Sequence, residues 1–243
     1  MTTGTIYGVG VGPGDPDLVT VRAARILERA RYVAFFRKAG SKGRARSIAD
    51  AYLGDQVESL PLEYPVTTEL PHTDARYKAL MLEFYDESTN EVWKLARQGH
   101  EVAVICEGDP FFYGSFMHLY DRLPEEAQVE VVPGITSMSA AWTLTGVPVT
   151  RGTEVMTVLT GIDSEEELVR RMRDTDALVV MKLGRQLPKV RRALHAAGLA
   201  QRAWLVEYAT MPQQRVHRLA ELPQSHVAPY FSVVVVHGTA GQP

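Results

Sequence analysis

The stretch that decides the fold is TIYGVGVGPGDP, residues 5–16, where a short apolar run enters a turn rich in glycine. Residues 5–9 have the length and composition of a buried strand. Asp15 and Pro16 are residue types that favour a helix N-cap and a first helical position. An apolar stripe from Val19 to Ala30 follows with a period near 3.6 residues. The segment therefore predicts a strand, a tight turn and a helix that begins at Pro16.

The same alternation of short apolar runs and helical patterns continues along the chain. Helical periodicity is found around residues 77–84, 137–144 and 187–197, and the stretch 59–74, with three prolines, is predicted to be a loop. Alternating strands and helices predict an α/β architecture. We place a domain boundary after residue 134, which gives an N-terminal α/β domain over 1–134 and a C-terminal one over 135–243. The further predicted strands are residues 32–36, 102–106, 129–132, 155–159, 177–181, 203–207 and 232–236.

Composition limits the functional classes. The chain has 243 residues, 45% of them hydrophobic, and a formal net charge of -3, which argues against a nucleic-acid binder driven by positive charge. No apolar run approaches the roughly 20 residues of a membrane span. The first residues do not resemble a secretory signal, and the single cysteine, Cys106, excludes an internal disulfide, so we expect a cytoplasmic protein. The scattered histidines predict no metal site.

Two more turns follow predicted strands, CEGDPFFYG at residues 106–114 and VPGITSMS at 132–139. Ligands of open α/β sheets bind at such strand ends, and Asp109 could accept hydrogen bonds from a ligand. The first turn departs from the glycine pattern G-x-G-x-x-G that binds dinucleotides. In that pattern an acidic residue about 20 positions further on contacts a ribose, and here the basic residues Arg37 and Lys38 end the next predicted strand instead. Three alternatives stay open from the residues alone: turns without a ligand, a ligand-sensing module, and an NADP-dependent oxidoreductase whose Arg37 and Lys38 meet a 2′-phosphate.

Taken together, the turns GVGPGDP (10–16), EGDPFFYG (107–114) and VVPGITS (131–137), with VVMKLGR (179–185) and VEYAT (206–210), resemble the tetrapyrrole methylase family over nearly the whole chain. The resemblance implies two α/β domains with S-adenosyl-L-methionine (SAM) in the cleft between them, and a homodimer. The segments at 32–38, 62–67 and 108–116 are similar to those of family members that methylate C20 of precorrin-2. That reaction gives precorrin-3A and S-adenosyl-L-homocysteine (SAH) and belongs to cobalamin biosynthesis, a branch of porphyrin biosynthesis. A cobalt-containing precorrin-2 or another tetrapyrrole is the alternative substrate.

Carried over position by position, the resemblance also implies site residues. No general base is identified, and the departures at Glu107 and Ala209 from the family pattern favour backbone contacts there. Lys189, Arg191 and Arg192 are interpreted as the solvated face of a helix. The candidate substrate contacts are Arg37, Lys38 and Arg151, whose positive charges suit the carboxylates of a tetrapyrrole, together with Tyr113. The implied cofactor contacts are Pro13, Glu107, Gly108, Asp109, Phe112, Thr136, Ser137, Met181 and Ala209.

Overall fold

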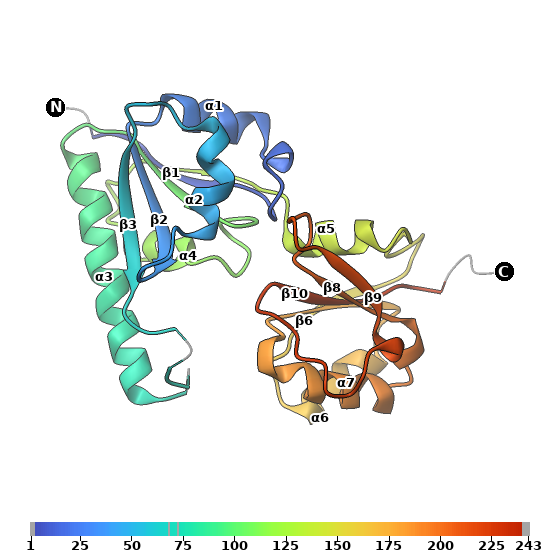
Figure 1. Cartoon of the computed structure of the whole chain (residues 1–243). Coiled ribbons are helices and arrows are strands. Elements are labelled where there is room, and N and C mark those ends of the chain that lie inside the picture. The colour runs from blue at the N-terminus through green and yellow to red at the C-terminus, as the bar shows by residue number, and fades with distance from the viewer. Residues whose placement is uncertain (1–2, 68, 72, 240–243) are drawn as a thin grey trace. The chain divides into compact units, whose positions relative to one another are not determined.

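The computed structural model describes residues 3–67, 69–71 and 73–239 and divides the chain into two compact units, Met1–Thr136 and Ser137–Pro243. Each unit is built on a five-stranded sheet with helices packed against it (Figure 1). The α/β class predicted from the alternating pattern is therefore confirmed. The division falls between Thr136 and Ser137, next to the limit expected from the sequence.

The sheet of the first unit is entirely parallel, with the strand order β3-β2-β4-β1-β5. Every residue of β1 and β4 is buried, as expected for strands covered on both faces. Since β1 lies between β4 and β5, the turns that follow these three strands leave the same edge of the sheet. The strands are β1 (Ile6–Gly10), β2 (Tyr32–Lys38), β3 (Glu58–Tyr64), β4 (Val102–Cys106) and β5 (Val129–Val132).

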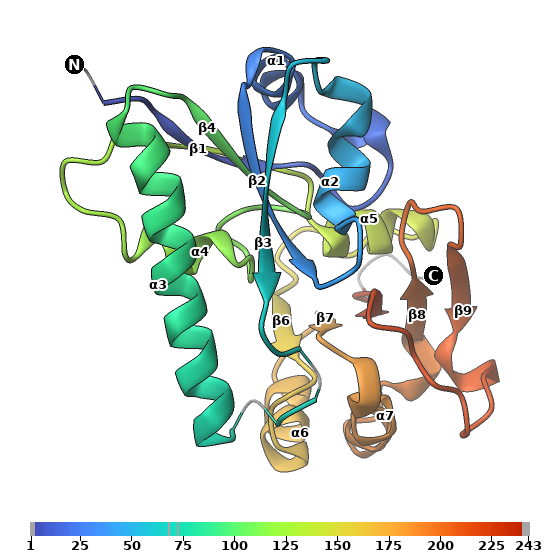
Figure 2. The same cartoon turned by 60° about the vertical axis from the view of Figure 1, so that its left-hand side comes forward.

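Helices cover both faces of this sheet. On one face, α1 (Val21–Arg29) and α2 (Arg44–Ala49) contribute to a core with Val9, Phe35 and Ile105. On the other face, α3 (Ala75–Arg97) and α4 (Phe116–Tyr120) pack against alternate side chains of the same strands. Figure 2 shows the two pairs of helices on opposite sides of the strands.

Two expectations for the first unit were wrong in detail. The helix predicted from Pro16 is interrupted: Asp15 caps only a short 3-10 helix, η1 (Pro16–Leu18), and Thr20 then caps α1 by accepting a hydrogen bond from the Ala23 N–H. The stretch 59–74 was predicted to be a loop, but residues 59–64 belong to the strand β3. Pro61 is tolerated there because β3 is an edge strand that pairs only with β2.

The second unit has a mixed sheet in the order β6-β7-β10-β8-β9, in which β6 and β7 are parallel and the other pairs antiparallel. Helix α5 (Ser137–Leu144) packs on one face, and α6 (Glu165–Arg173) and α7 (Leu187–Ala196) pack on the other. Among the described residues, no helix is long and apolar enough to cross a membrane. The strands are β6 (Met156–Thr160), β7 (Ala177–Met181), β8 (Ala203–Glu207), β9 (Arg215–Arg218) and β10 (Ser232–Val236).

Candidate functional site

The three turns singled out in the sequence meet at the carboxyl edge of the first sheet. Gly12 and Gly108 form an isolated β-bridge between the first and second turns. The Gly108 N–H donates to the Gly12 carbonyl at 2.8 Å, and the Val11 N–H donates to the Cys106 carbonyl at 2.9 Å. The first two turns are therefore held together by main-chain hydrogen bonds.

The third turn approaches so closely that side chains are excluded. A Cβ atom added at Gly134 would lie 2.0 Å from the Gly108 carbonyl oxygen, and one added at Gly10 would lie 2.6 Å from the Gly134 nitrogen. Both obstacles are main-chain atoms, which cannot rotate away as a side chain can. Glycine at these two positions is therefore explained by contact between the turns themselves.

Asp109 links the second turn to the third. Its Oδ1 accepts a hydrogen bond from the Phe111 N–H at 2.9 Å, and its Oδ2 accepts one from the Gly134 N–H at 3.0 Å. Sequence reasoning assigned this carboxylate to a ligand. In the structure both of its oxygens bond main-chain N–H groups, so its first role is to hold two turns in place.

Glu107 has a comparable positioning contact. Its Oε1 accepts a hydrogen bond from the Ala45 N–H at 3.0 Å, in the first turn of α2. Gly43, at the N-cap of this helix, has no side chain to do so. A carboxylate at a helix N-terminus is favourable because it satisfies an unpaired N–H and opposes the positive end of the helix dipole. Glu107 thus fixes α2 beside the second turn.

The aromatic residues of the second turn differ in exposure. Phe112 is half-buried, whereas Tyr113 is exposed, and their rings meet edge to face with centroids 4.8 Å apart. Pro13, within the first turn, is buried. Cys106 is a buried thiol, as the sequence predicted, and burial raises its pKa well above its usual range. It is therefore unsuited to act as a nucleophile.

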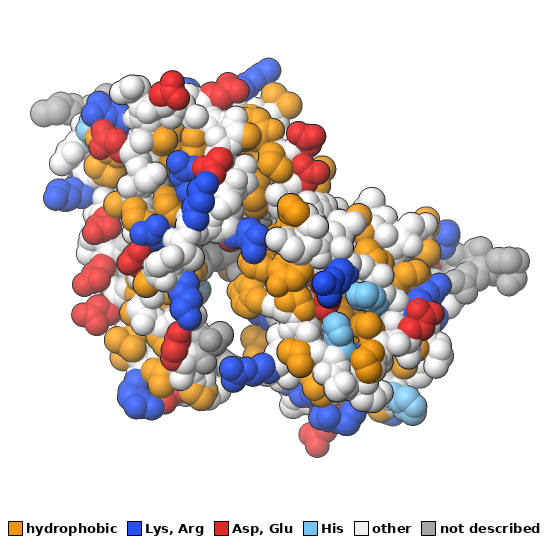
Figure 3. All heavy atoms as spheres, in the orientation of Figure 1, with side chains coloured by type: hydrophobic (Ala, Val, Ile, Leu, Met, Phe, Trp, Pro, Cys, Tyr) orange, Lys and Arg blue, Asp and Glu red, His pale blue; other side chains and the backbone are white. Residues whose placement is uncertain are grey.

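The predicted substrate-binding cations are already paired with acidic neighbours. Arg37 Nε donates to Glu63 Oε1 at 2.9 Å, and Lys38 Nζ lies 2.9 Å from Glu69 Oε1. Hydrogen bonds from the Thr67 N–H and then from Lys38 lower the pKa of Glu69 to about 2. On the face in Figure 3, basic side chains are interspersed with acidic ones. An anionic substrate would have to displace these carboxylates.

In the second unit, the predicted contacts lie on the α5 side of the sheet. Ser137 is the first residue of α5 and directly follows Thr136. Met181 ends β7 and Ala209 follows β8, and both pack in one apolar cluster with Ala140 of α5. Met181 and Ala209 therefore lie beside this helix, although they follow Ser137 by 44 and 72 positions in the sequence.

Backbone strain marks the same positions. Among the described residues, the non-glycine residues with positive φ are Tyr113 (57°), Lys182 (53°), Tyr208 (50°) and Thr210 (63°). Each directly follows or precedes a predicted cofactor contact: Phe112, Met181 or Ala209. Residues held in this sparsely populated region cost free energy and concentrate at ligand sites. The sequence named Tyr113 as a substrate contact, but it did not indicate the positive φ of any of the four, because none is of a type that favours a left-handed backbone.

Arg151 stands apart from these features in the second unit. Its side chain is exposed, and its N–H donates to Glu154 Oε2 at 2.7 Å. The same Glu154 carboxylate fills the space where a Cβ at Gly238 would lie. These contacts order the segment that precedes β6 without defining a ligand for Arg151.

Two histidines that seemed scattered in the sequence meet around one buried carboxylate. Glu207 is only 2% exposed, and its Oε1 lies 2.7 Å from His226 Nε2, while its Oε2 lies 4.0 Å from His217 Nε2. Within residues 3–67, 69–71 and 73–239, no three potential ligands are arranged to hold a metal ion. The two histidines follow Glu207 by 10 and 19 positions, a spacing that forms no recognisable motif in the sequence.

Comparison with known proteins gives a consistent result. The chain is 47% identical over 240 residues to a precorrin-2 C(20)-methyltransferase from Sinorhizobium sp., covering 99% of this chain and 98% of that protein. It is 31% identical to the cobalt-precorrin-2 C(20)-methyltransferase of Salmonella typhimurium, with 96% of each protein covered.

Solved structures agree in fold. A cobalt precorrin-4 methyltransferase superimposes with a TM-score of 0.72 at 22% identity, covering 96% of this chain and 94% of that one. A uroporphyrin-III C-methyl transferase from Thermus thermophilus, complexed with S-adenosyl homocysteine, has a TM-score of 0.68 at 24% identity, with 96% and 97% covered. The family model for Tetrapyrrole (Corrin/Porphyrin) Methylases matches residues 5–223. The chain therefore belongs to the tetrapyrrole methylase family.

Proposed function

We propose that this chain transfers the methyl group of SAM to C20 of precorrin-2, giving precorrin-3A and SAH in cobalamin biosynthesis. The observation that carries the proposal is 47% identity over 99% of the chain to a relative named for this reaction. A match over nearly the whole length of both proteins includes the turns and strand ends described above, so the likeness is not limited to the sheet scaffolds.

The residues present fit a SAM site. In the first unit, Pro13, Gly108 and Phe112 lie in turns that main-chain hydrogen bonds hold together. These turns supply a preorganised surface at the strand ends, where main-chain groups could contact a ligand. In the second unit, strained main chain at Lys182 and Tyr208 adjoins the proposed contacts Met181 and Ala209. Strain of this kind persists where the surrounding structure enforces it, as at a ligand clamp. Thr136 and Ser137 complete the proposed set, with Glu107 and Asp109 as positioning residues.

In the proposed reaction, SAM supplies a methyl carbon already activated by a sulfonium. The main contribution of the chain is then to hold the acceptor carbon in line with that methyl, which converts a bimolecular encounter into an oriented one. The locked turns serve this purpose because they need little reorganisation when the substrate binds. Exposed Tyr113, with its strained backbone, is placed next to these turns and is a proposed contact of the macrocycle.

The carboxylates of the substrate require cations. Arg37, Lys38 and Arg151 are the proposed partners, and Arg is suited to bidentate pairing. Since Glu63 and Glu69 already hold Arg37 and Lys38, substrate binding would exchange one carboxylate partner for another. Exposed ion pairs of this kind contribute little free energy, so the exchange is inexpensive.

The runner-up substrate is cobalt-precorrin-2, supported by 31% identity to the Salmonella typhimurium enzyme of that name. The metal-free substrate is favoured by the higher identity of the first relative. An NADP-dependent oxidoreductase is disfavoured by family membership and by the ion pairs that occupy Arg37 and Lys38. A homodimer and a cytoplasmic location stay proposals, and light scattering of the purified chain tests the first of them.

A transfer assay tests the function. The purified chain is incubated with methyl-labelled SAM and either precorrin-2 or cobalt-precorrin-2, and label in the tetrapyrrole fraction is counted. We expect transfer with a larger kcat/KM for precorrin-2. Transfer to neither substrate, by a protein that binds SAH in calorimetry, would reject both tetrapyrroles and leave cofactor binding intact. If calorimetry instead detects binding of NADP and no binding of SAH, the oxidoreductase is supported.

A further inference from the structure

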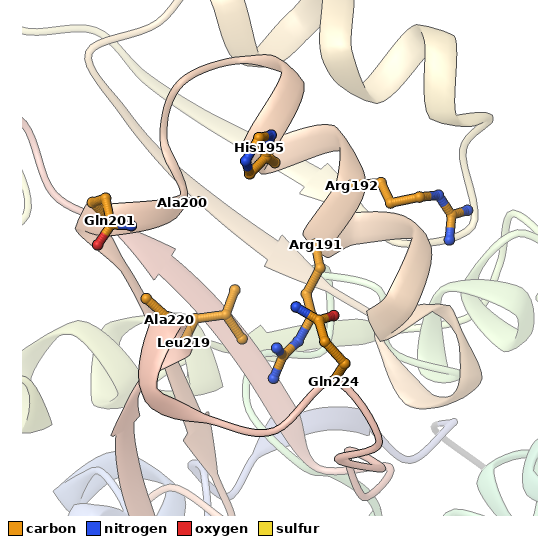
Figure 4. Close-up of a pocket in the computed structure, with 8 residues that line it drawn as sticks. All are labelled: Arg191, Arg192, His195, Ala200, Gln201, Leu219, Ala220 and Gln224. Carbon is orange, nitrogen blue, oxygen red and sulfur yellow. The ribbon is translucent and has the colours of Figure 1, made fainter.

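A pocket of about 290 Å³ opens in the second unit between α7 and the segment that follows β9 (Figure 4). Its volume is at the lower end of the range for small-molecule sites. The side chains of Arg191, Arg192 and His195 come from α7, and the described residues that line the pocket include no aspartate or glutamate. The remaining lining residues are Ala200, Gln201, Leu219, Ala220 and Gln224. The lining thus combines cations and amides.

Arg191 is the unusual member of this set. Its Nη1 donates to the Leu222 carbonyl at 3.1 Å, but its Nε and Nη2 are shielded from solvent and have no hydrogen-bond partner among the residues that the structure describes. Burial accordingly lowers the pKa of Arg191. Buried donors in native proteins are nearly always satisfied, so two unsatisfied nitrogens on one guanidinium call for an explanation. The interpretation of this helix as plain solvated surface was therefore wrong at Arg191.

The two unpartnered nitrogens have a specific geometry. Nε–H and Nη2–H form one edge of the guanidinium, the edge that presents two parallel donors to a carboxylate or phosphate. The neighbouring Arg192 uses the same edge on Glu165, with Nε and Nη2 at 2.9 and 2.7 Å from Oε2. Among the described residues Arg191 has no such acid, so an oxyanion from outside the chain would reach this edge once the side chains that shield it move.

The pocket lies on the opposite face of the sheet from the proposed cofactor contacts. Leu194 of α7 packs in the core with Leu178 and Val180, whereas Met181 packs with Val179 and α5 on the other face. Successive strand residues point to opposite faces, so the sheet separates the two places. A ligand in this pocket is therefore distinct from SAM.

We propose that the pocket binds a small oxyanion, a carboxylate or a phosphate group, on the Nε and Nη2 edge of Arg191. His195, Gln201 and Gln224 supply further donors on its rim. Because the two nitrogens are shielded from solvent, a rim side chain must move when the anion enters. Gln224 is suited to this movement since it is exposed and lies outside the regular elements. The inference does not depend on the proposed methyl transfer.

The test is a calorimetric titration of the full chain with inorganic phosphate and, separately, with malonate, at constant ionic strength set with potassium chloride. We expect saturable binding of at least one anion with a Kd of millimolar or below, and the two arms tell a phosphate site from a carboxylate site. Arg191→Lys keeps the charge but loses the fork, so we expect binding to weaken about tenfold or more. Arg171→Lys, the same substitution at an exposed arginine of α6 that does not line the pocket, is the matched control and should change the Kd less than twofold.

The proposal is overturned if neither anion gives saturable heat up to about 50 mM, or if Arg171→Lys weakens binding as much as Arg191→Lys. A measurement on the unmodified chain tests the proposal even if the variants do not fold. In ¹⁵N-correlated NMR, the assigned Nε–H resonance of Arg191 should shift with phosphate or malonate along the same saturation curve. An unmoved Arg191 resonance during binding would place the anion elsewhere.

Discussion

Replacing Asp109 with alanine should destabilise the first unit before any ligand is present. The change removes the acceptor of the Gly134 N–H, at 3.0 Å and partly buried, and that of the exposed Phe111 N–H, at 2.9 Å. Water can replace the acceptor at Phe111 but reaches Gly134 less readily. A hydrogen bond to a charged group contributes about 1.5–3 kcal/mol, so we expect a loss of that size in the free energy of unfolding. Affinity for SAH should fall with it, since the third turn is no longer held.

Urea unfolding of the ligand-free protein gives the stability change, and amide hydrogen exchange reports the Gly134 N–H directly. Asp121→Ala, an exposed aspartate at the end of α4, is the control and should change stability by less than about 0.5 kcal/mol. If Asp109→Ala leaves both the unfolding free energy and Gly134 exchange unchanged while SAH binding weakens, Asp109 acts on the ligand alone. That result would refute the positioning role.

Three further changes test other parts of the structure. Gly10→Ala places a Cβ 2.5 Å from the Gly108 carbonyl oxygen, so thermal unfolding should reveal a loss of about 1–3 kcal/mol or more, and an unchanged midpoint would contradict the contact between turns. Cys106, buried and with a raised pKa, should react with a thiol reagent at pH 8 only when urea unfolds the chain; rapid reaction of the native protein would show that the strand end opens. Burial lowers the pKa of His237 below its ordinary value of 6.5, so the unfolded chain takes up a proton first and stability should fall as the pH decreases below about 6.5. His237→Gln should flatten that decrease in urea midpoints, and an equally steep profile in the variant would assign it to another group.

Much of the fold could be predicted because local pattern and tertiary structure agree. The strand predicted at residues 102–106 is β4 itself, since five successive apolar residues suit a strand buried on both faces. The edge strand β3 was missed because Pro61 and alternating polar residues are typical of a loop, and only its pairing with β2 makes the stretch a strand. The helix predicted from Pro16 failed for a related reason, since Thr20 provides a second cap that a periodic stripe does not show.

The three turns could be singled out from the sequence, but the contacts that hold them together could not. The glycine-rich turns are adjacent in space, yet the sequence could not show that Gly10 and Gly134 meet each other or that Asp109 bonds the Gly134 N–H. These contacts join residues more than 20 positions apart and leave no local signal. The same holds for Arg191, whose neighbours on α7 gave no indication that its guanidinium is shielded.

If the chain methylates one carbon of a reduced tetrapyrrole, NMR of the product identifies that carbon. Precorrin-2 is incubated with the purified chain and SAM carrying a ¹³C-methyl group, and the enriched carbon of the product is assigned through its coupling to the macrocycle. The account predicts a single enriched methyl group bonded to C20. An enriched methyl on any other ring carbon would contradict it.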